Sequence, residues 1–566
     1  MRRPASLVYG LEDAPPLHVT VLNGAQYVAL IAITLVYPLL VFRVAASPAD
    51  LIAGLLAVGM IVLGVGAFLQ SRRMGPIGSG YMCPATFTAG YLGPSLLAAQ
   101  IGGLPLVFGM TLFAGVLEIV IAPLLSRLRP IFPPEISGLV IFIIGLSGGL
   151  AGLRAMLGEQ AAPVIVAEWW VGAVTLGAMI ALNVWGRGIA RMLCALFGLA
   201  IGYLAAGLTG VFTAADAKSV AAADWLGLPS FGHIAWSFDA SLIAPFAIAC
   251  VAAAMKAVGT IAVCQRINDA DWVRPDMRTI TPGVVADGAT TALAGLVGSF
   301  GMNTSTPAVG LSAATGVASR RVAYAVGGLF IAIGLLPKLT AVLAVMPRPV
   351  VVAALLFSVS FIMINGLQVM SSRMLDARRT LVLGLAIVAG MAVEVFPNLG
   401  AMVPVAARPF FGSSLVLATV VALALNLLFR AGVKQTATLT VERGPLRSEE
   451  LDEFMERNGA AWGAQRDVIE RAKFNLRQSL EVILDSCEPR GPVEVAATFD
   501  EFNLDIRVSY DGPALTLPER RPSDEDILAT DDGHRQLAGY LLRRFADRVT
   551  ATEKGGRSTI LFHFDH

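Results

Sequence analysis

Charged residues are scarce in this sequence, and they are unevenly distributed. Of the 566 residues, 15% are charged and 55% are hydrophobic, and the formal net charge is +1. A soluble domain has about 25% charged residues, so this composition excludes an ordinary soluble protein. The small net charge gives no indication of a nucleic-acid partner. Residues 25–430 are apolar blocks separated by short charged turns, whereas residues 440–566 resemble soluble protein, which predicts a membrane body followed by a polar tail.

Cysteine and histidine are also rare, with five of each. The cysteines have no paired spacing and no neighbouring histidines, so the sequence indicates neither a disulfide framework nor a metal site. The first 24 residues contain two early arginines but no apolar run that leads to a small-residue cleavage site. We interpret residues 1–24 as a cytoplasmic tail rather than a signal peptide.

Apolar segments of the length that spans a bilayer, about 20 residues, recur through residues 25–431. Three of them, 85–99, 283–298 and 307–318, are short and interrupted by Gly, Pro, Ser or Thr. The stronger segments are 25–42, 51–69, 103–125, 135–152, 168–186, 190–211, 240–263, 322–345, 349–367, 379–396 and 410–430. The sequence therefore predicts an all-α polytopic membrane protein with fourteen transmembrane segments.

Arginines mark the ends of the even-numbered segments, whereas the odd-numbered ends have at most single charges. The positive-inside rule then places both termini, and residues 432–566, on the cytoplasmic side of the inner membrane. Omitting segment 85–99 or segment 307–318 would break this alternation. The marking arginines are Arg72, Arg73, Arg127, Arg129, Arg187, Arg191, Arg266, Arg274, Arg278, Arg320, Arg321, Arg373, Arg378, Arg379 and Arg430.

The two halves of the membrane body resemble each other. The sequence Cys-Pro-Ala-Thr at 83–86 corresponds to Thr-Pro-Ala-Val at 306–309, and a proline-led span follows in each half. Seven segments per half is an odd number, which predicts an inverted 7+7 repeat. Inverted repeats with one interrupted segment each are typical of secondary transporters, whose substrates bind where helices are broken.

These features resemble the nucleobase–ascorbate transporter family, which includes the bacterial xanthine and uracil permeases, over residues 20–431. Gln26-Tyr27 is similar to the family's Gln-His pair, residues 133–138 to its proline-led fifth helix, and residues 310–316 to the end of its signature. The resemblance implies a core domain and a gate domain that move in an elevator-like way, in a homodimer surrounded by lipid. It also implies substrate-binding positions at Tyr27, Thr86, Phe87, Lys256, Thr260, Ser305, Thr306, Pro307 and Ala308.

Two departures from the family concern charge. The first two positions of its signature, usually Gln, Glu or Pro and then Asn, are Pro307 and Ala308 here. Lys256 stands where its eighth helix usually has a glutamate. Lys256 lies roughly 15 Å and 24 Å from the two ends of its span at 1.5 Å per residue. A charge at that depth costs about 2.5–3.5 kcal/mol, so it is expected to be paired, neutral or hydrated. It either pairs with Glu118 or binds an acceptor-rich or anionic base.

Residues 432–566 alternate helical and strand patterns: a helix over 470–484, strands over 493–499 and 504–510, a helix over 533–547 and a final strand over 558–564. This small α/β domain resembles the ATPase domain of histidine kinases and anti-sigma factors. The resemblance implies nucleotide-binding positions at Asn475, Asp511, Gly512 and Gly533, with ATP as a possible cofactor. The magnesium motif and the glycine-rich lid are missing, which favours a degenerate regulatory module that binds a cytoplasmic protein.

Two alternatives to a nucleobase permease stay open. A sulfate-permease-like anion transporter has the same repeat, and Lys256 would suit it. A membrane sensor could bind a ligand in the transport fold and signal through the tail.

Overall fold

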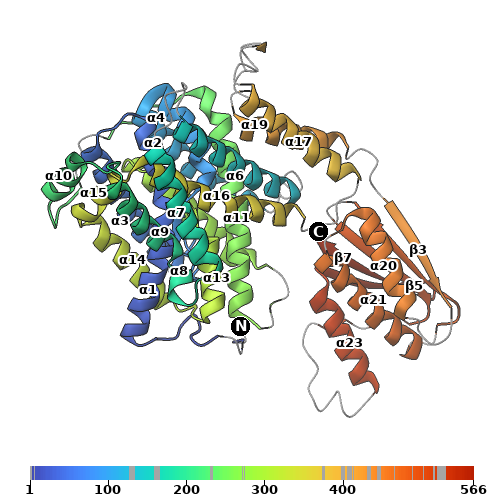
Figure 1. Cartoon of the computed structure of the whole chain (residues 1–566). Coiled ribbons are helices and arrows are strands. Elements are labelled where there is room, and N and C mark those ends of the chain that lie inside the picture. The colour runs from blue at the N-terminus through green and yellow to red at the C-terminus, as the bar shows by residue number, and fades with distance from the viewer. Residues whose placement is uncertain are drawn as a thin grey trace. The chain divides into compact units, whose positions relative to one another are not determined.

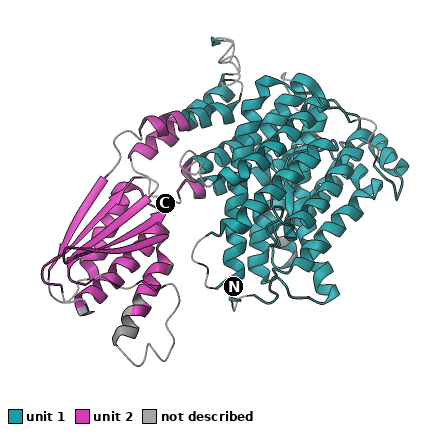
Figure 2. Ribbon diagram, turned by 180° about the vertical axis from the view of Figure 1, so that it is seen from behind, with its two compact units in different colours: residues 1–132, 136–368, 386–421 teal, residues 133–135, 369–385, 422–566 magenta. Residues whose placement is uncertain are grey.

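The computed structural model describes residues 3–4, 7–125, 134–157, 166–229, 234–270, 272, 275–371, 377–396, 402–403, 411, 413–429, 435–442, 448–464, 466–486, 489–500, 503–513, 515, 517–518 and 531–565. The chain divides into two compact units (Figure 2). One comprises residues 1–132, 136–368 and 386–421, and the other comprises 133–135, 369–385 and 422–566. Each unit is described by itself.

The first unit is a helical bundle (Figure 1). Its helices are α1 (Leu17–Ala32), α2 (Val36–Val44), α3 (Ala49–Ser71), α4 (Leu92–Ile121), α6 (Pro134–Leu157), α7 (Val166–Val184), α8 (Ile189–Met192), α9 (Cys194–Leu208), α10 (Ala214–Ala222), α11 (Ile243–Asn268), α12 (Met277–Leu296), α13 (Thr306–Thr315), α14 (Arg320–Gly334), α15 (Pro337–Ala344) and α16 (Arg348–Met370). Helices α17 (Ala377–Val395) and α19 (Ser414–Leu428) are each divided between the two units, and the first two residues of α6 and the last two of α16 also belong to the second unit.

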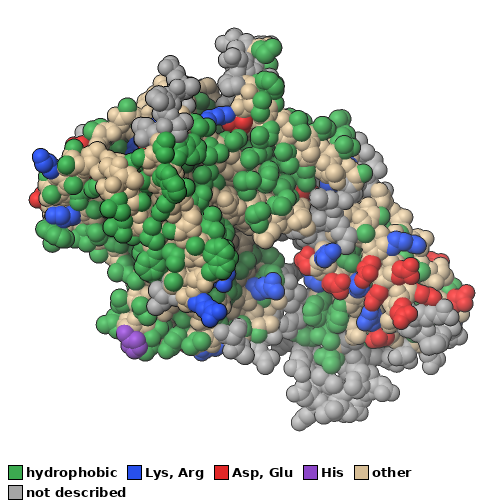
Figure 3. Space-filling model, viewed as in Figure 1, with side chains coloured by type: hydrophobic (Ala, Val, Ile, Leu, Met, Phe, Trp, Pro, Cys, Tyr) green, Lys and Arg blue, Asp and Glu red, His purple; other side chains and the backbone are tan. Residues whose placement is uncertain are grey.

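Within the described part of the chain, seven helical stretches are long and apolar enough to cross a membrane. An eighth is the pair α14 and α15, which is bent by 78°. Apolar side chains cover much of the visible surface of this unit (Figure 3). Lipid offers no hydrogen bonds, so a surface of this kind on helices identifies a multi-pass membrane protein.

The three short, interrupted segments of the sequence do not all form the same kind of structure. The stretch Ala89–Leu124 has 36 residues, roughly 54 Å of helix at 1.5 Å per residue, which is too long for one span of about 30 Å. It bends at Gly103, whose φ of 65° interrupts α4 between segments 85–99 and 103–125. The third weak segment, 283–298, lies in one continuous helix, α12, which begins earlier, at Met277. The expectation of a break there is wrong.

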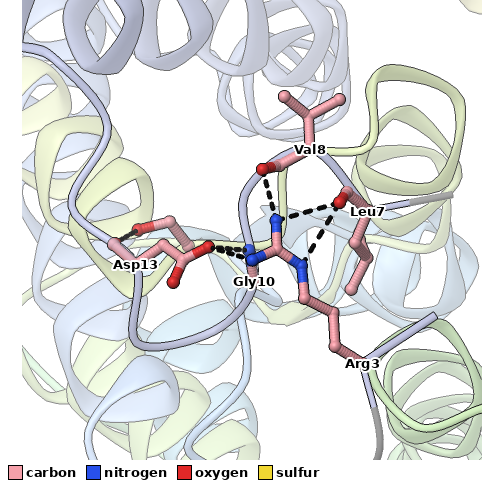
Figure 4. Close-up of polar contacts among 6 residues, drawn as sticks. Arg3, Leu7, Val8, Gly10 and Asp13 are labelled. Atoms are coloured by element: carbon pink, nitrogen blue, oxygen red, sulfur yellow. Dashed lines mark hydrogen bonds and ion pairs between the residues drawn. The ribbon is translucent and has the colours of Figure 1, made fainter. Parts of the chain in front are cut away.

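The N-terminal strap, residues 3–4 and 7–15, packs on the junction of α13 and α14. Val8 and Tyr9 donate backbone hydrogen bonds to Gly316 O at 2.8 and 3.0 Å, and Ala318 N donates to Tyr9 O at 2.9 Å. Within the strap, Arg3 pairs with Asp13 at 2.9 Å and donates to the Leu7 and Val8 carbonyls (Figure 4). The strap therefore holds the loop that follows α13.

The second unit contains a five-stranded antiparallel sheet in the order β3-β4-β5-β7-β6. Its strands are β3 (Gln435–Val441), β4 (Val493–Phe499), β5 (Asn503–Asp511), β6 (Arg548–Lys554) and β7 (Arg557–Asp565). Helices α20 (Ser448–Trp462), α21 (Arg466–Ser486) and α23 (Asp531–Phe545) accompany it (Figure 1). Alternate residues of β4 and β5 are buried in one core with α20 and α21, as period-two strands require. Strand β4 has the bounds that the sequence predicts, whereas β3, α20 and β6 were not predicted.

Candidate functional site

Two short strands meet where the sequence predicts broken helices. Strand β1 (Ala85–Phe87) pairs antiparallel with β2 (Met302–Thr304), and Thr86 lies opposite Asn303. Ser305 N donates to Pro84 O at 3.0 Å, and Thr88 N donates to Gly301 O at 3.2 Å, which extends the pairing at both ends. Backbone that is not helical at this depth needs such internal partners. The two interruptions therefore satisfy each other.

A helix begins after each strand. Thr88 caps the 3-10 turn Ala89–Tyr91 that leads into α4, and its hydroxyl accepts from Gly90 N at 3.3 Å. Ser305 caps α13 and accepts from Ala308 N, also at 3.3 Å. The first amide groups of a helix attract anions and acceptor atoms. Two half-helices from opposite halves of the chain thus begin at one strand pair.

Helix α11 joins this site through Thr260. Its hydroxyl donates to Lys256 O at 2.8 Å, and its oxygen lies 2.9 Å from that of Thr306. Because the Thr260 hydroxyl donates its proton to the Lys256 carbonyl, the Thr306 hydroxyl is the donor in the bond between the two threonines. The structure therefore brings Thr260 together with Thr306, which follows Ser305 in the chain, and Lys256 lies one turn before Thr260 on α11.

Open space adjoins the same region. A Cβ atom built on Gly259 of α11, or on Gly310 of α13, would have no other heavy atom within 4 Å. Pro307 is exposed and Lys256 is part-exposed, whereas Ala308 is 1% exposed. The face of α13 that is free to meet a ligand therefore contains Pro307 and Gly310 rather than the Ala308 side chain.

Three other predicted positions point elsewhere. Thr86 shares a 2.9 Å hydrogen bond with Thr34, and Phe87 is buried against Phe300, with ring centroids 6.3 Å apart. Tyr27 is fully buried and lies 3.0 Å from the Ser312 hydroxyl, two turns along α13. The backbone of β1 borders the site, but the side chains of Phe87 and Tyr27 serve packing.

Sequence reasoning missed Asp287 on α12 and Asn303 on β2. Asp287 is 3% exposed and accepts a hydrogen bond of 2.5 Å from Asn303 Nδ2, which also donates to Ala253 O at 2.9 Å. Asp287 interacts electrostatically with Lys256, without a direct ion pair among the described residues. The signal was available, because a lone acid in an apolar helix marks a functional position by default.

The pair of Lys256 with Glu118 is not formed in this structure. Neither carboxylate oxygen of Glu118 has a hydrogen-bond partner in the described part of the chain. The side chain of Glu118 lies beside Gly288 of α12. The charged group that interacts with the Glu118 carboxyl is therefore Asp287, the residue before Gly288.

The permease family that contains xanthine and uracil permeases matches residues 18–399 of this chain. The chain belongs to this family. It is a transporter rather than an enzyme. The family match confirms the resemblance drawn from residues 26–27, 133–138 and 310–316.

Relatives of this permease with known names include xanthine permeases. XanP of Escherichia coli is 25% identical over 444 residues, which cover 75% of this chain and 95% of XanP. XanQ of the same organism is 25% identical over 464 residues, covering 79% of this chain and 98% of XanQ. The uric acid permease PucK of Bacillus subtilis is 24% identical over 434 residues, covering 76% and 99%. The family match ends at residue 399, before the sheet-containing tail.

The positions considered for nucleotide binding lie on three elements of the tail of the permease. Asn475 lies in α21 with 0% exposure, and neither amide atom has a partner in the described residues. Asp511 ends β5 and is exposed, and Gly512 N donates to Gly556 O at 3.2 Å. Gly533 lies in the first turn of α23. Asn475 is thus a buried residue of α21, whereas Asp511 is exposed at the end of β5.

Proposed function

We propose that this permease moves a nucleobase such as xanthine, urate or uracil across the cytoplasmic membrane, and that xanthine or urate is preferred. The observation that carries this proposal is the strand pair β1–β2 beside Lys256, with α13 beginning at Thr306. The names of XanP, XanQ and PucK support a purine rather than an inorganic anion.

The preference follows from the charges at the site. Lys256 and the amide groups at the start of α13 all favour acceptor atoms or negative charge. Xanthine and urate present several carbonyl oxygens and lose a proton more readily than uracil. A glutamate at this position would instead accept from the N–H groups of a base.

We infer fourteen spans in a 7+7 inverted repeat, with residues 1–24 and 432–566 in the cytoplasm and residues 25–431 in the membrane. The antiparallel pairing of β1 with β2 supports an inverted relationship of the halves. An elevator-like movement of a core domain against a gate domain, in a lipid-embedded homodimer, completes the proposed mechanism. The tail is a regulatory module that binds a cytoplasmic protein.

The deciding experiment is a thermal-shift screen of the purified full chain against purines, pyrimidines and inorganic anions, followed by uptake of radiolabelled ligands into proteoliposomes. We expect stabilisation and uptake with xanthine or urate. Stabilisation by sulfate or bicarbonate alone would favour an anion transporter. Ligand binding without uptake would favour a sensor.

A further inference from the structure

A cluster of buried polar groups lies among α4, α11, α12 and β2. Glu118, Tyr91 and Asn303 are each 0% exposed, and Asp287 is 3% exposed. Among the described residues, the other titratable groups that face this cluster are Cys250 and Lys256 on α11 and Cys83, which precedes β1. The nucleobase site proposed above uses none of Glu118, Tyr91 or Cys250.

The two carboxyl groups approach each other because α4 and α12 touch through glycines. A Cβ atom on Gly288 would lie 2.9 Å from Gly115 O and 3.0 Å from the Glu118 Cβ. Asp287 directly precedes Gly288 in the chain. A larger residue at either glycine would force the helices apart, so these glycines permit the close approach that brings Glu118 within electrostatic reach of Asp287.

Asp287 has the partners of an ionised carboxylate. Asn303 Nδ2 donates to it at 2.5 Å, the backbone N–H of Thr304 donates to it as well, and Lys256 supplies positive charge nearby. Hydrogen bonds to the charged form and an opposite charge both favour ionisation. Burial opposes ionisation, so these groups balance a negative charge on Asp287 only in part.

Glu118 has no such balance. Both of its oxygens lack a hydrogen-bond partner in the described residues, and the same holds for the nearby Tyr91 hydroxyl and Asn303 Oδ1. A second negative charge beside Asp287, buried and unpaired, is strongly disfavoured. Glu118 therefore requires a positive partner, and a proton needs only one acceptor atom, whereas a metal ion needs a cage of several ligands.

We propose that Glu118 is the proton-binding site of this permease, taking up and releasing one proton in each transport cycle. The proposal rests on the proposed nucleobase transport. Asp287 connects the two functions, because it holds Asn303, which pairs with Thr86 in the strands that border the substrate site. Binding of a base at these strands can thereby change the environment of Glu118.

The test uses the full chain in proteoliposomes with radiolabelled xanthine and urate. With the lumen one pH unit more alkaline than the outside, one coupled proton supports up to about tenfold accumulation of a neutral base. We expect Glu118→Gln to exchange internal for external base at the wild-type rate and to lose this accumulation. The control is Asp50→Asn, which changes an exposed carboxyl at the start of α3 and should accumulate normally.

Exchange by the variant establishes that it is folded, and Glu118→Met provides a second neutral side chain of similar volume. Infrared difference spectra of the wild type supply a further readout, because a buried protonated carboxyl band should shift on addition of xanthine and be lost in Glu118→Gln. Two results would overturn the proton site while leaving the transporter assignment intact. One is that a folded neutral variant still accumulates the base. The other is that accumulation by the wild type depends on a Na+ gradient alone. If the wild type neither binds nor exchanges any base, the proposed function fails, and the proton site fails with it.

Discussion

The hydroxyl oxygens of Thr260 and Thr306 lie 2.9 Å apart, which joins the middle of α11 to the first residue of α13. This bond fixes the start of the half-helix relative to Lys256, one turn away from Thr260. A ligand at the helix start would therefore meet the α13 amide groups and the lysine together. The first two predictions test this arrangement.

Filling the open space beside the site should block binding. Gly310→Phe adds a Cβ atom that has no neighbouring heavy atom within 4 Å, and its ring extends into the space beyond, so the fold should tolerate it while the ligand loses its place. We expect at least about tenfold weaker xanthine uptake, the equivalent of about 1.4 kcal/mol. Gly177→Phe on α7 is the matched control, since Gly177 is also helical and unobstructed. Equal uptake by both variants would exclude Gly310 from the site.

Ala308 is unsuitable for this test. Its side chain is buried, so a larger residue there would test packing rather than ligand binding.

Removing the charge of Lys256 should weaken binding of anionic bases. Hydrogen bonds to charged groups contribute about 1.5–3 kcal/mol, so Lys256→Met should lower xanthine or urate affinity by roughly 10- to 100-fold. Lys256→Glu should shift preference toward uracil, because a carboxylate accepts from N–H groups. Lys338→Met serves as control, because Lys338 lies on α15 rather than α11, and its Nζ atom is 4.5 Å from the centre of the Trp225 ring. Wild-type affinity in a folded Lys256→Met protein would show that the lysine is structural.

The sequence predicted the broken helices but not the partner of Lys256, for a physical reason. Gly and Pro around residues 84 and 307 interrupt helices locally, and their effect can be read along the chain. Whether Lys256 faces Glu118 or Asp287 depends on how α4, α11 and α12 pack. That packing is decided by Gly115 and Gly288, whose close approach no local pattern reveals. The alternating apolar residues of β4 could be recognised. Strand β3 has the same alternation, with Ala437, Leu439 and Val441 packed against the core, but it is more exposed than β4 and was overlooked.

The topology prediction concerns the C-terminus. Arginines that follow the even-numbered segments place residues 432–566 in the cytoplasm. A C-terminal fusion should therefore be active with a reporter that works in the cytoplasm, such as green fluorescent protein, and inactive with alkaline phosphatase. The same reporters fused after Arg43, at an odd-numbered end, should give the opposite pattern. Phosphatase activity at the C-terminus would reverse the proposed orientation.

The N-terminal strap should stabilise the region that follows α13. Arg320 forms an ion pair with Glu12 and donates to Gly80 O at 2.6 Å, so it holds both the strap and the loop before β1. We expect Arg320→Ala to lower the free energy of unfolding by about 1–3 kcal/mol, as for loss of charged hydrogen bonds. Arg321→Ala is the neighbouring control, because Arg321 is exposed. Equal melting temperatures for the two variants in detergent would show that the strap contributes no stability.

The tail should not bind nucleotide. An ATP site on this sheet would need Asn475 and Asp511 to face one ligand, but Asn475 is 0% exposed beneath the sheet and Asp511 is exposed at the end of β5. The Tyr510 hydroxyl donates to Pro513 O at 2.8 Å, which holds the turn after β5 against its own strand. We therefore expect the full chain to show no saturable binding of a fluorescent ATP analogue up to millimolar concentration, with Asp511→Ala identical to wild type. Saturable binding that Asp511→Ala abolishes would show instead that α21 moves to expose Asn475, and the tail would then be a nucleotide-dependent regulator of transport.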